Sequence, residues 1–260
     1  MMQADAILLW GMFLLCFARV VGFFVQAPIW GSGHIPKPAL VGTGACIAVV
    51  VFPSLPVPKA LPPDLFELAI MLLGQLAVGL VIGYVSFLVL AGAQFAGELL
   101  DIQMGLSVAA SFDPASHGTV NLIRRFKFYL AMMIYLILNG HHTLLMALKR
   151  SFEVIPLTGF EFPKSLIYNL IDMTTQVFII GIQIAAPALA ALFITQVALG
   201  LLARVAPQMN VFMLSFPLNI MIGLMMILVA LPLVYKGLDS YFSTNLNQIL
   251  QSIKMMTPGR

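Results

Sequence analysis

Three long stretches without Asp, Glu, Lys or Arg constrain the fold of this chain more than any other feature. They cover residues 68–97, 173–203 and 205–235. Each is longer than the roughly 20 residues that a helix needs to cross the hydrocarbon core of a bilayer. Backbone groups in lipid must find hydrogen-bond partners within the protein, and apolar runs of this length without alternation exclude a membrane barrel. The sequence therefore predicts an all-α, membrane-type protein.

Shorter uncharged stretches at 20–36, 38–58 and 128–148, with the apolar run at 6–18, raise the expected number of membrane helices. We expect about six, within a range of about five to eight. Apolar residues make up 61% of the chain and charged residues 9%, so the chain has more apolar and far fewer charged residues than a water-soluble domain. The formal net charge is only +3, and the densest cluster of basic residues is Arg124 and Arg125 followed by Lys127. We therefore expect no nucleic-acid partner.

Glycine and proline punctuate the apolar stretches. Small residues recur about every four positions along 65–97, which favours close helix–helix contact at Gly74, Gly79, Gly83, Gly92 and Gly97. A continuous helix over this range would measure roughly 45–50 Å and exceed the bilayer core of about 30 Å, so it must tilt, protrude or break. We expect an ordered loop over 98–127, a single helix over 128–148 and kinks at the prolines of 173–235.

Four charged residues lie within or at the edge of apolar stretches and are candidates for buried charge pairs: Arg19, Glu98, Asp101 and Arg204. An unpaired charge in the membrane costs at least about 2.5–3.5 kcal/mol, so such residues are functional candidates. On a helix Glu98 and Asp101 would share a face and could attract an arginine. The alternative is that all four sit at interfaces or pair for structural reasons.

Known catalytic and metal-binding patterns are absent from the sequence. It contains no H-E-x-x-H, G-x-S-x-G, Walker-type loop or C-x-x-C. His141 and His142 are adjacent, which points their side chains about 100° apart on a helix and makes them poor joint ligands for one metal. We expect no enzymatic activity, no metal and no cofactor.

Four sequence strings together resemble one family, the R-type subunit of the flagellar type III export gate (the FliR/SctT family). They are ARVVGFFVQAPIWG near the start, GELLDIQMGLSVAASFDP in the middle, NGHH at 139–142, and LGLLARVAPQMNVFMLSFPLNIMIGL at 199–224. The resemblance spans nearly the full chain. It is the combination of the second and fourth strings that is specific, since each alone would be weak.

The resemblance implies one export-gate domain over 1–260, made of long, kinked helical hairpins. Its parts would be a first helical half (1–105), a plug loop (106–121), a second helical half (122–235) and a polar C-terminal tail (236–260). The chain would assemble with homologous P-type (FliP) and Q-type (FliQ) subunits into a helical cone around a central pore. FlhB-type and FlhA-type subunits would surround this gate in the bacterial inner membrane, at the flagellar basal body. Unfolded flagellar proteins would be the substrates.

The resemblance also implies site residues. The plug that closes the pore would contain Leu106, Ser107, Val108, Ala109, Ala110, Ser111, Phe112, Asp113 and Pro114. Residues expected to pack between subunits are Gln103, Met104, Gly105, Pro207, Gln208, Asn210, Phe212, Phe216 and Pro217.

Two other classes of protein remain as alternatives. A self-sufficient small-molecule transporter would use Arg19, Glu98 or Arg204 to contact its substrate near the middle of the membrane, although no internal repeat is visible. A membrane enzyme would need clustered polar residues at one depth. A transporter should purify alone, whereas an export-gate subunit should be unstable without its partners.

Overall fold

The regular elements of the chain are helices throughout the described residues. The computed structural model describes residues 2–33, 35–56, 64–106 and 122–258. The helices are α1 (Met2–Gln26), α2 (Lys37–Val51), α3 (Leu65–Gln103), α5 (Leu122–Ile137), α6 (Gly140–Val154), α7 (Lys164–Val205) and α8 (Val211–Met255), with short 3₁₀ turns at Trp30–Ser32 and Phe52–Ser54. The predicted all-α fold is confirmed.

Five helices in the described ranges are long and apolar enough to cross a membrane, and six spans result if α5 and α6 count as one broken span. This agrees with the expected number. The predicted single helix over 128–148 is wrong, because α5 ends at Ile137 and α6 begins at Gly140. Asn139 between them has a left-handed backbone with φ 56°. Such a residue cannot continue a right-handed helix, and Asn tolerates this conformation better than most residues do.

Two further boundaries differ from the prediction. The expected loop over 98–127 is partly helical, since α3 continues to Gln103 and α5 begins at Leu122. The polar tail from 236 onward is not separate from the preceding helix, because α8 continues to Met255. Its apolar side chains Ile249 and Ile253 are buried, and a buried face stabilises a helix whose other face is polar.

The chain forms two compact units. The first contains residues 1–88, 139–173 and 242–260, and the second contains 89–138 and 174–241. Each unit therefore takes segments from both of the expected halves of the sequence. Helices α3, α7 and α8 contribute to both units.

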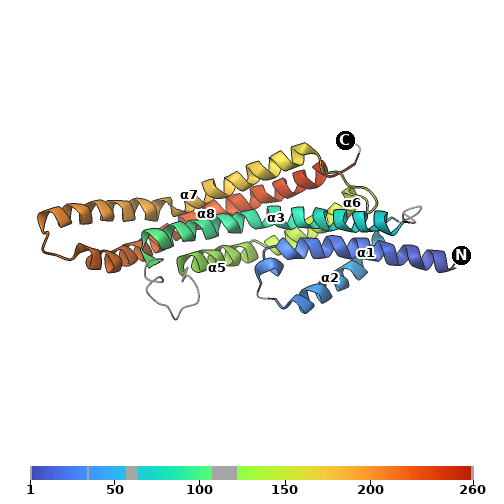
Figure 1. The fold of residues 1–260 in the computed structure, drawn as a ribbon, viewed down its shortest axis with the longest axis horizontal. Helices are drawn as coiled ribbons and strands as arrows, with labels where there is room; N and C mark the ends of the chain where they lie inside the picture. Colours follow the sequence, from blue (N-terminus) through green and yellow to red (C-terminus); the bar gives the residue numbers. More distant parts are fainter. Residues whose placement is uncertain (1, 34, 57–63, 107–121, 259–260) are drawn as a thin grey trace. The chain divides into compact units, whose positions relative to one another are not determined.

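Close contact between α1 and α3 organises the first unit, with α2 packed beside α1 (Figure 1). A Cβ atom added at Gly79 or Gly22 would collide with a backbone carbonyl oxygen of the facing helix, and one at Gly83 would lie 2.6 Å from the carbonyl oxygen of Phe23. The glycines let the two backbones touch, as the spacing of small residues predicted. Around them the core includes Leu15, Val20, Phe23, Phe24, Val78 and Ile82.

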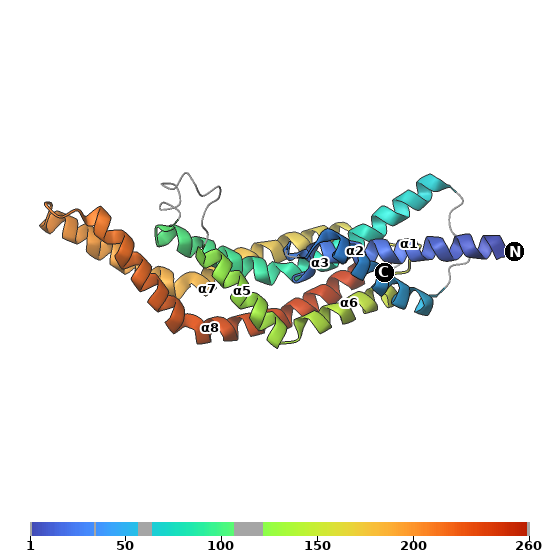
Figure 2. The ribbon, with the colours of Figure 1, turned by 90° about the horizontal axis from the view of Figure 1, so that it is seen from below.

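In the second unit, α7 and α8 run side by side to the loop at 206–210 that joins them (Figure 2). Large apolar side chains are exposed along both helices: Val205 is 82% exposed, Met213 67% and Phe193 67%. Apolar surface of this extent must meet lipid or another protein. Pro187 lies inside α7, and two further prolines lie inside α8.

Candidate functional site

The strongest candidate site is the place in the second unit where α3 ends and α5 begins, which we call the loop base. Asp101 near the end of α3 is fully buried. Its Oδ1 accepts a hydrogen bond from the backbone N–H of Ile123 at 3.0 Å, and its Oδ2 accepts one from the N–H of Arg124 at 2.9 Å. The first amides of a helix have no partner within that helix, and a carboxylate also interacts favourably with the helix dipole. Asp101 therefore fixes the start of α5 on the end of α3.

The approach of α5 to α3 at the loop base depends on Gly97. A Cβ atom at this position would lie 2.8 Å from the backbone nitrogen of Arg124. Only a residue without a side chain fits here without displacing α5. The same approach brings the first amides of α5 within reach of Asp101, one helical turn further along α3.

The two sequence strings whose combination resembles the export-gate family contact each other at the loop base. Gly105 has a left-handed backbone with φ 77° and follows the end of α3, a position that favours glycine. A Cβ atom there would lie 2.8 Å from the ring of Phe216 on α8. The fully buried Met104 packs against Gly223 in the same way. A Cβ atom added at Gly223 would lie 2.7 Å from Sδ of Met104. Met104, Gly105 and Phe216 therefore meet within this chain.

Polar side chains complete the contacts of the loop base. The Nε2 of Gln196 on α7 donates a hydrogen bond to the Oε1 of Gln103 at 3.0 Å. Asn219 lies three residues after Phe216 and so near the same face of α8. It is 7% exposed, and its Oδ1 is buried without a hydrogen-bond partner in the described part of the chain. Sequence reasoning assigned no role to this asparagine.

The expected plug falls mostly outside the described residues. Leu106, three residues after the end of α3, lies within the described residues, whereas 107–121 lie outside them. The plug assignment therefore stays a prediction. The structure does show that the segments flanking it on either side are tied together by Asp101.

Arg19 on α1 forms a second buried polar cluster, located in the first unit. Its guanidinium donates to Gln75 Oε1 at 2.7 Å, to the Ser151 carbonyl at 2.8 Å and to the Ile155 carbonyl at 3.0 Å. The ring of Phe152 lies 4.4 Å from its Cζ. The last carbonyls of a helix lack intrahelical donors, and a cation near them is stabilised by the helix dipole. Arg19 thus caps the C-terminal end of α6, and all its hydrogen-bond partners here are neutral oxygens and not a carboxylate.

The four charged candidates therefore behave differently from one another. Asp101 bonds to backbone amides and Arg19 to neutral oxygens, so these two do not need an opposite charge. Glu98 and Arg204 are exposed in this chain. A role in pairing with another chain stays a prediction for them.

The other residues expected to pack between subunits lie around the loop that joins α7 and α8. Pro207, Gln208, Phe212 and Pro217 are exposed. Asn210 caps α8, because its Oδ1 accepts a hydrogen bond from the Met213 N–H at 3.2 Å. This local role is one that an Asn directly before a helical run could have suggested. Contact with other subunits stays a prediction for all of them.

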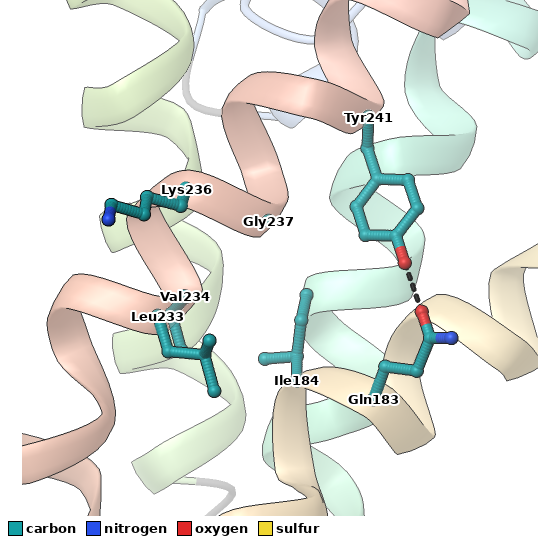
Figure 3. A pocket seen from close by; sticks show the side chains of 7 residues that line it. All are labelled: Gln183, Ile184, Leu233, Val234, Lys236, Gly237 and Tyr241. Carbon is teal, nitrogen blue, oxygen red and sulfur yellow. Dashed lines mark hydrogen bonds between the residues drawn. The ribbon is translucent and has the colours of Figure 1, made fainter.

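A pocket of about 390 Å³ lies between α7 and α8 in the second unit. The hydroxyl of Tyr241 donates a hydrogen bond to Oε1 of Gln183 across this pocket, while Lys236 points away from the pair (Figure 3). The side chains of Tyr241 and Gln183 are thus bonded to each other. The residues that line the pocket include no Asp, Glu or His, so they offer no acid–base pair for catalysis. Within the described ranges, no group of three His, Cys, Asp or Glu side chains could hold a metal ion.

Sequence reasoning missed most of the partners of the buried charges. Gln75 joins the Arg19 cluster to the loop after α6, because its Nε2 donates to the Leu157 carbonyl at 2.8 Å. The signal was a polar side chain inside the uncharged stretch 68–97, where each polar group needs a partner. Nothing in the sequence pointed to Ser151 and Phe152, since their role depends on where α6 ends.

Comparison with known proteins gives consistent matches over nearly the whole chain. The model of the family described as bacterial export proteins, family 1, matches residues 10–244. The flagellar biosynthetic protein FliR of Bacillus subtilis strain 168 is 32% identical over 235 residues, covering 89% of this chain and 90% of that protein. FliR of Escherichia coli K12 is 30% identical over 235 residues, with 90% of each chain covered. FliR of Aquifex aeolicus is 27% identical over 237 residues, with 88% of each covered.

Proposed function

We propose that this chain, which belongs to family 1 of the bacterial export proteins, is a core subunit of the flagellar type III protein export gate. The observation that carries the proposal is the similarity to flagellar biosynthetic proteins along about nine tenths of both chains. The apolar helices and the similarity to FliR proteins together indicate an integral membrane protein of the flagellar export apparatus. We place it in the bacterial inner membrane, at the flagellar basal body.

The proposed gate is an assembly of this chain with P-type (FliP) and Q-type (FliQ) subunits around a central pore. Helices α7 and α8 contain 42 and 45 residues. At 1.5 Å per residue they are roughly 63 and 68 Å long, about twice the thickness of the bilayer core. Such helices cannot be covered by lipid alone, and their exposed apolar side chains favour neighbouring protein subunits. FlhB-type and FlhA-type subunits would surround this assembly.

The proposed gating element is the segment 106–121, and the loop base is its anchor. A closed pore must hold back water and ions, and a constriction of apolar side chains can do so by excluding water. A plug needs fixed ends. Asp101 provides them, because it joins the end of α3, which precedes the plug, to the start of α5, which follows the plug. Unfolded flagellar proteins entering the pore would displace the plug. The role requires no catalytic step from this chain, and the energy would come from partner proteins.

The contacts of Arg19 remove it from the residues that a self-sufficient transporter could use to bind its substrate. Substrate recognition at the middle of the membrane needs a charged group that can reach the substrate. Arg19 is completely buried, and the carbonyls of α6 and Gln75 already use its donors. It is thus unsuited to bind and release a solute.

The test is export itself. In the source bacterium, deletion of this gene should remove flagellar hook and filament proteins from the culture medium while leaving their synthesis unchanged. Expression of the intact chain from a plasmid should restore secretion. Normal secretion in the deletion strain would refute the proposal. Loss of uptake of one solute, with export intact, would favour the transporter.

A further inference from the structure

A second cavity, of about 550 Å³, lies between α6 and the end of α8, which run beside each other in the first unit (Figure 2). The export-gate proposal gives it no role. Its apolar lining comes from Met146 and Ala147 on α6 and from Leu246 and Leu250 on α8. We call it the α6–α8 pocket.

The charged lining of the α6–α8 pocket consists of Lys149, Arg150 and Glu153, all exposed on the last turns of α6. The two cations outnumber the one acid, which leaves a net charge of +1. In the described part of the chain, the side chains of Lys149 and Arg150 have no hydrogen bond or ion pair, so their donors are free for a ligand. Lys254 follows Leu250 by four residues on α8 and therefore lies near the same helix face, one turn beyond the apolar lining.

We propose that the α6–α8 pocket binds an anionic phospholipid. The phosphate would lie against Lys149 and Arg150, and an acyl chain would extend along Met146, Leu246 and Leu250. The pocket combines cations at one end with apolar side chains along the helices. A phospholipid matches both, because its phosphate is negatively charged and its acyl chains are apolar. Basic pockets between membrane helices bind anionic headgroups for this reason. A zwitterionic lipid offers the same phosphate but adds a cation, which Lys149 and Arg150 repel.

Native mass spectrometry of the detergent-solubilised export complex containing this chain tests the proposal. The complex is titrated with phosphatidylglycerol and, in parallel, with phosphatidylcholine. One variant, Lys149→Gln with Arg150→Gln, removes both cations of the pocket. Its matched control, Lys37→Gln with Lys164→Gln, removes two exposed lysines of the first unit that do not line the pocket. A third variant, Glu153→Gln, removes the acid of the pocket.

We expect phosphatidylglycerol to bind more tightly than phosphatidylcholine. Each protein cation beside the lipid headgroup contributes about fivefold in affinity. The variant that lacks both Lys149 and Arg150 should therefore bind phosphatidylglycerol about 25-fold more weakly, and the control variant should bind it as the unmodified chain does. Glu153→Gln should strengthen binding by about fivefold, a gain that a misfolded protein cannot produce.

Three results would overturn the proposal. The first is equal affinity for the two lipids, and the second is equal weakening by the pocket variant and its control. The third is a complex in which a partner subunit already fills the pocket and none of the pocket variants changes lipid binding. The measurement does not depend on export activity, so the proposal can fail while the export function stands.

Discussion

Replacement of Asp101 by Asn tests how firmly the loop base holds the start of α5. The carboxylate of Asp101 accepts two buried hydrogen bonds, from the amides of Ile123 and Arg124. Asn offers one acceptor oxygen and no charge, so at least one charge-assisted bond is lost. Such a bond is worth about 1.5–3 kcal/mol, and a factor of ten corresponds to about 1.4 kcal/mol. The amides should therefore exchange with solvent roughly 10- to 150-fold faster.

The assay is hydrogen–deuterium exchange of the assembled complex, read by mass spectrometry on peptides that begin at Leu122. Glu98→Gln is the matched control, since Glu98 lies one turn earlier on α3 but is exposed. It should leave exchange at the start of α5 unchanged. The reasoning is refuted if Asp101→Asn changes the exchange rate by less than about twofold. It is equally refuted if both variants accelerate exchange to the same extent.

Three further predictions concern the plug and the two helix contacts of the first unit. Deletion of 107–118 should leave assembly intact but make membranes leak ions; tight membranes with normal assembly would remove the plug assignment. Gly79→Ala places a Cβ against the carbonyl of Arg19 and should destabilise the complex by about 1–3 kcal/mol in thermal unfolding, whereas Gly42→Ala, with no atom within 4 Å, should not. Arg19→Met leaves Gln75 Oε1 and the Ile155 carbonyl without their donor, and each loss should lower the free energy of unfolding by about 1–3 kcal/mol in thermal unfolding. Arg125→Met removes an exposed arginine and should be neutral, and equal effects of the two variants would contradict the structure.

The sequence predicted the features that depend on local pattern. Uncharged stretches located the helices that are long and apolar enough to cross a membrane, and the spacing of Gly79 and Gly83 predicted a close helix–helix contact. Only the structure shows that the partner of this contact is α1. Arg19 and Asp101 stood out because charges are rare in apolar helices. Their partners could not be predicted in the same way. Asp101 binds amides 22 and 23 residues away, and only the folded chain brings these together.

The errors have the same origin. Hydropathy does not register a single left-handed residue, so the break at Asn139 was missed within an apolar stretch, although the pair Asn139 and Gly140 is a turn signal. The polar end of α8 looked like a tail because its composition is ordinary. Its helical state depends on tertiary contacts: Asn245 donates a hydrogen bond to the Val85 carbonyl at 2.7 Å, and Ile249 is buried. For such segments packing decides the structure more than composition does.

The central claim is that this chain works as one subunit of a hetero-oligomeric gate, and the mass of its native complex tests this most directly. A tagged copy should be isolated from the source bacterium in mild detergent and weighed by native mass spectrometry. The account predicts one discrete complex that contains P-type and Q-type subunits, and loss of the chain by aggregation or degradation when it is expressed alone. A stable, monodisperse monomer that moves a solute by itself in liposomes would contradict it.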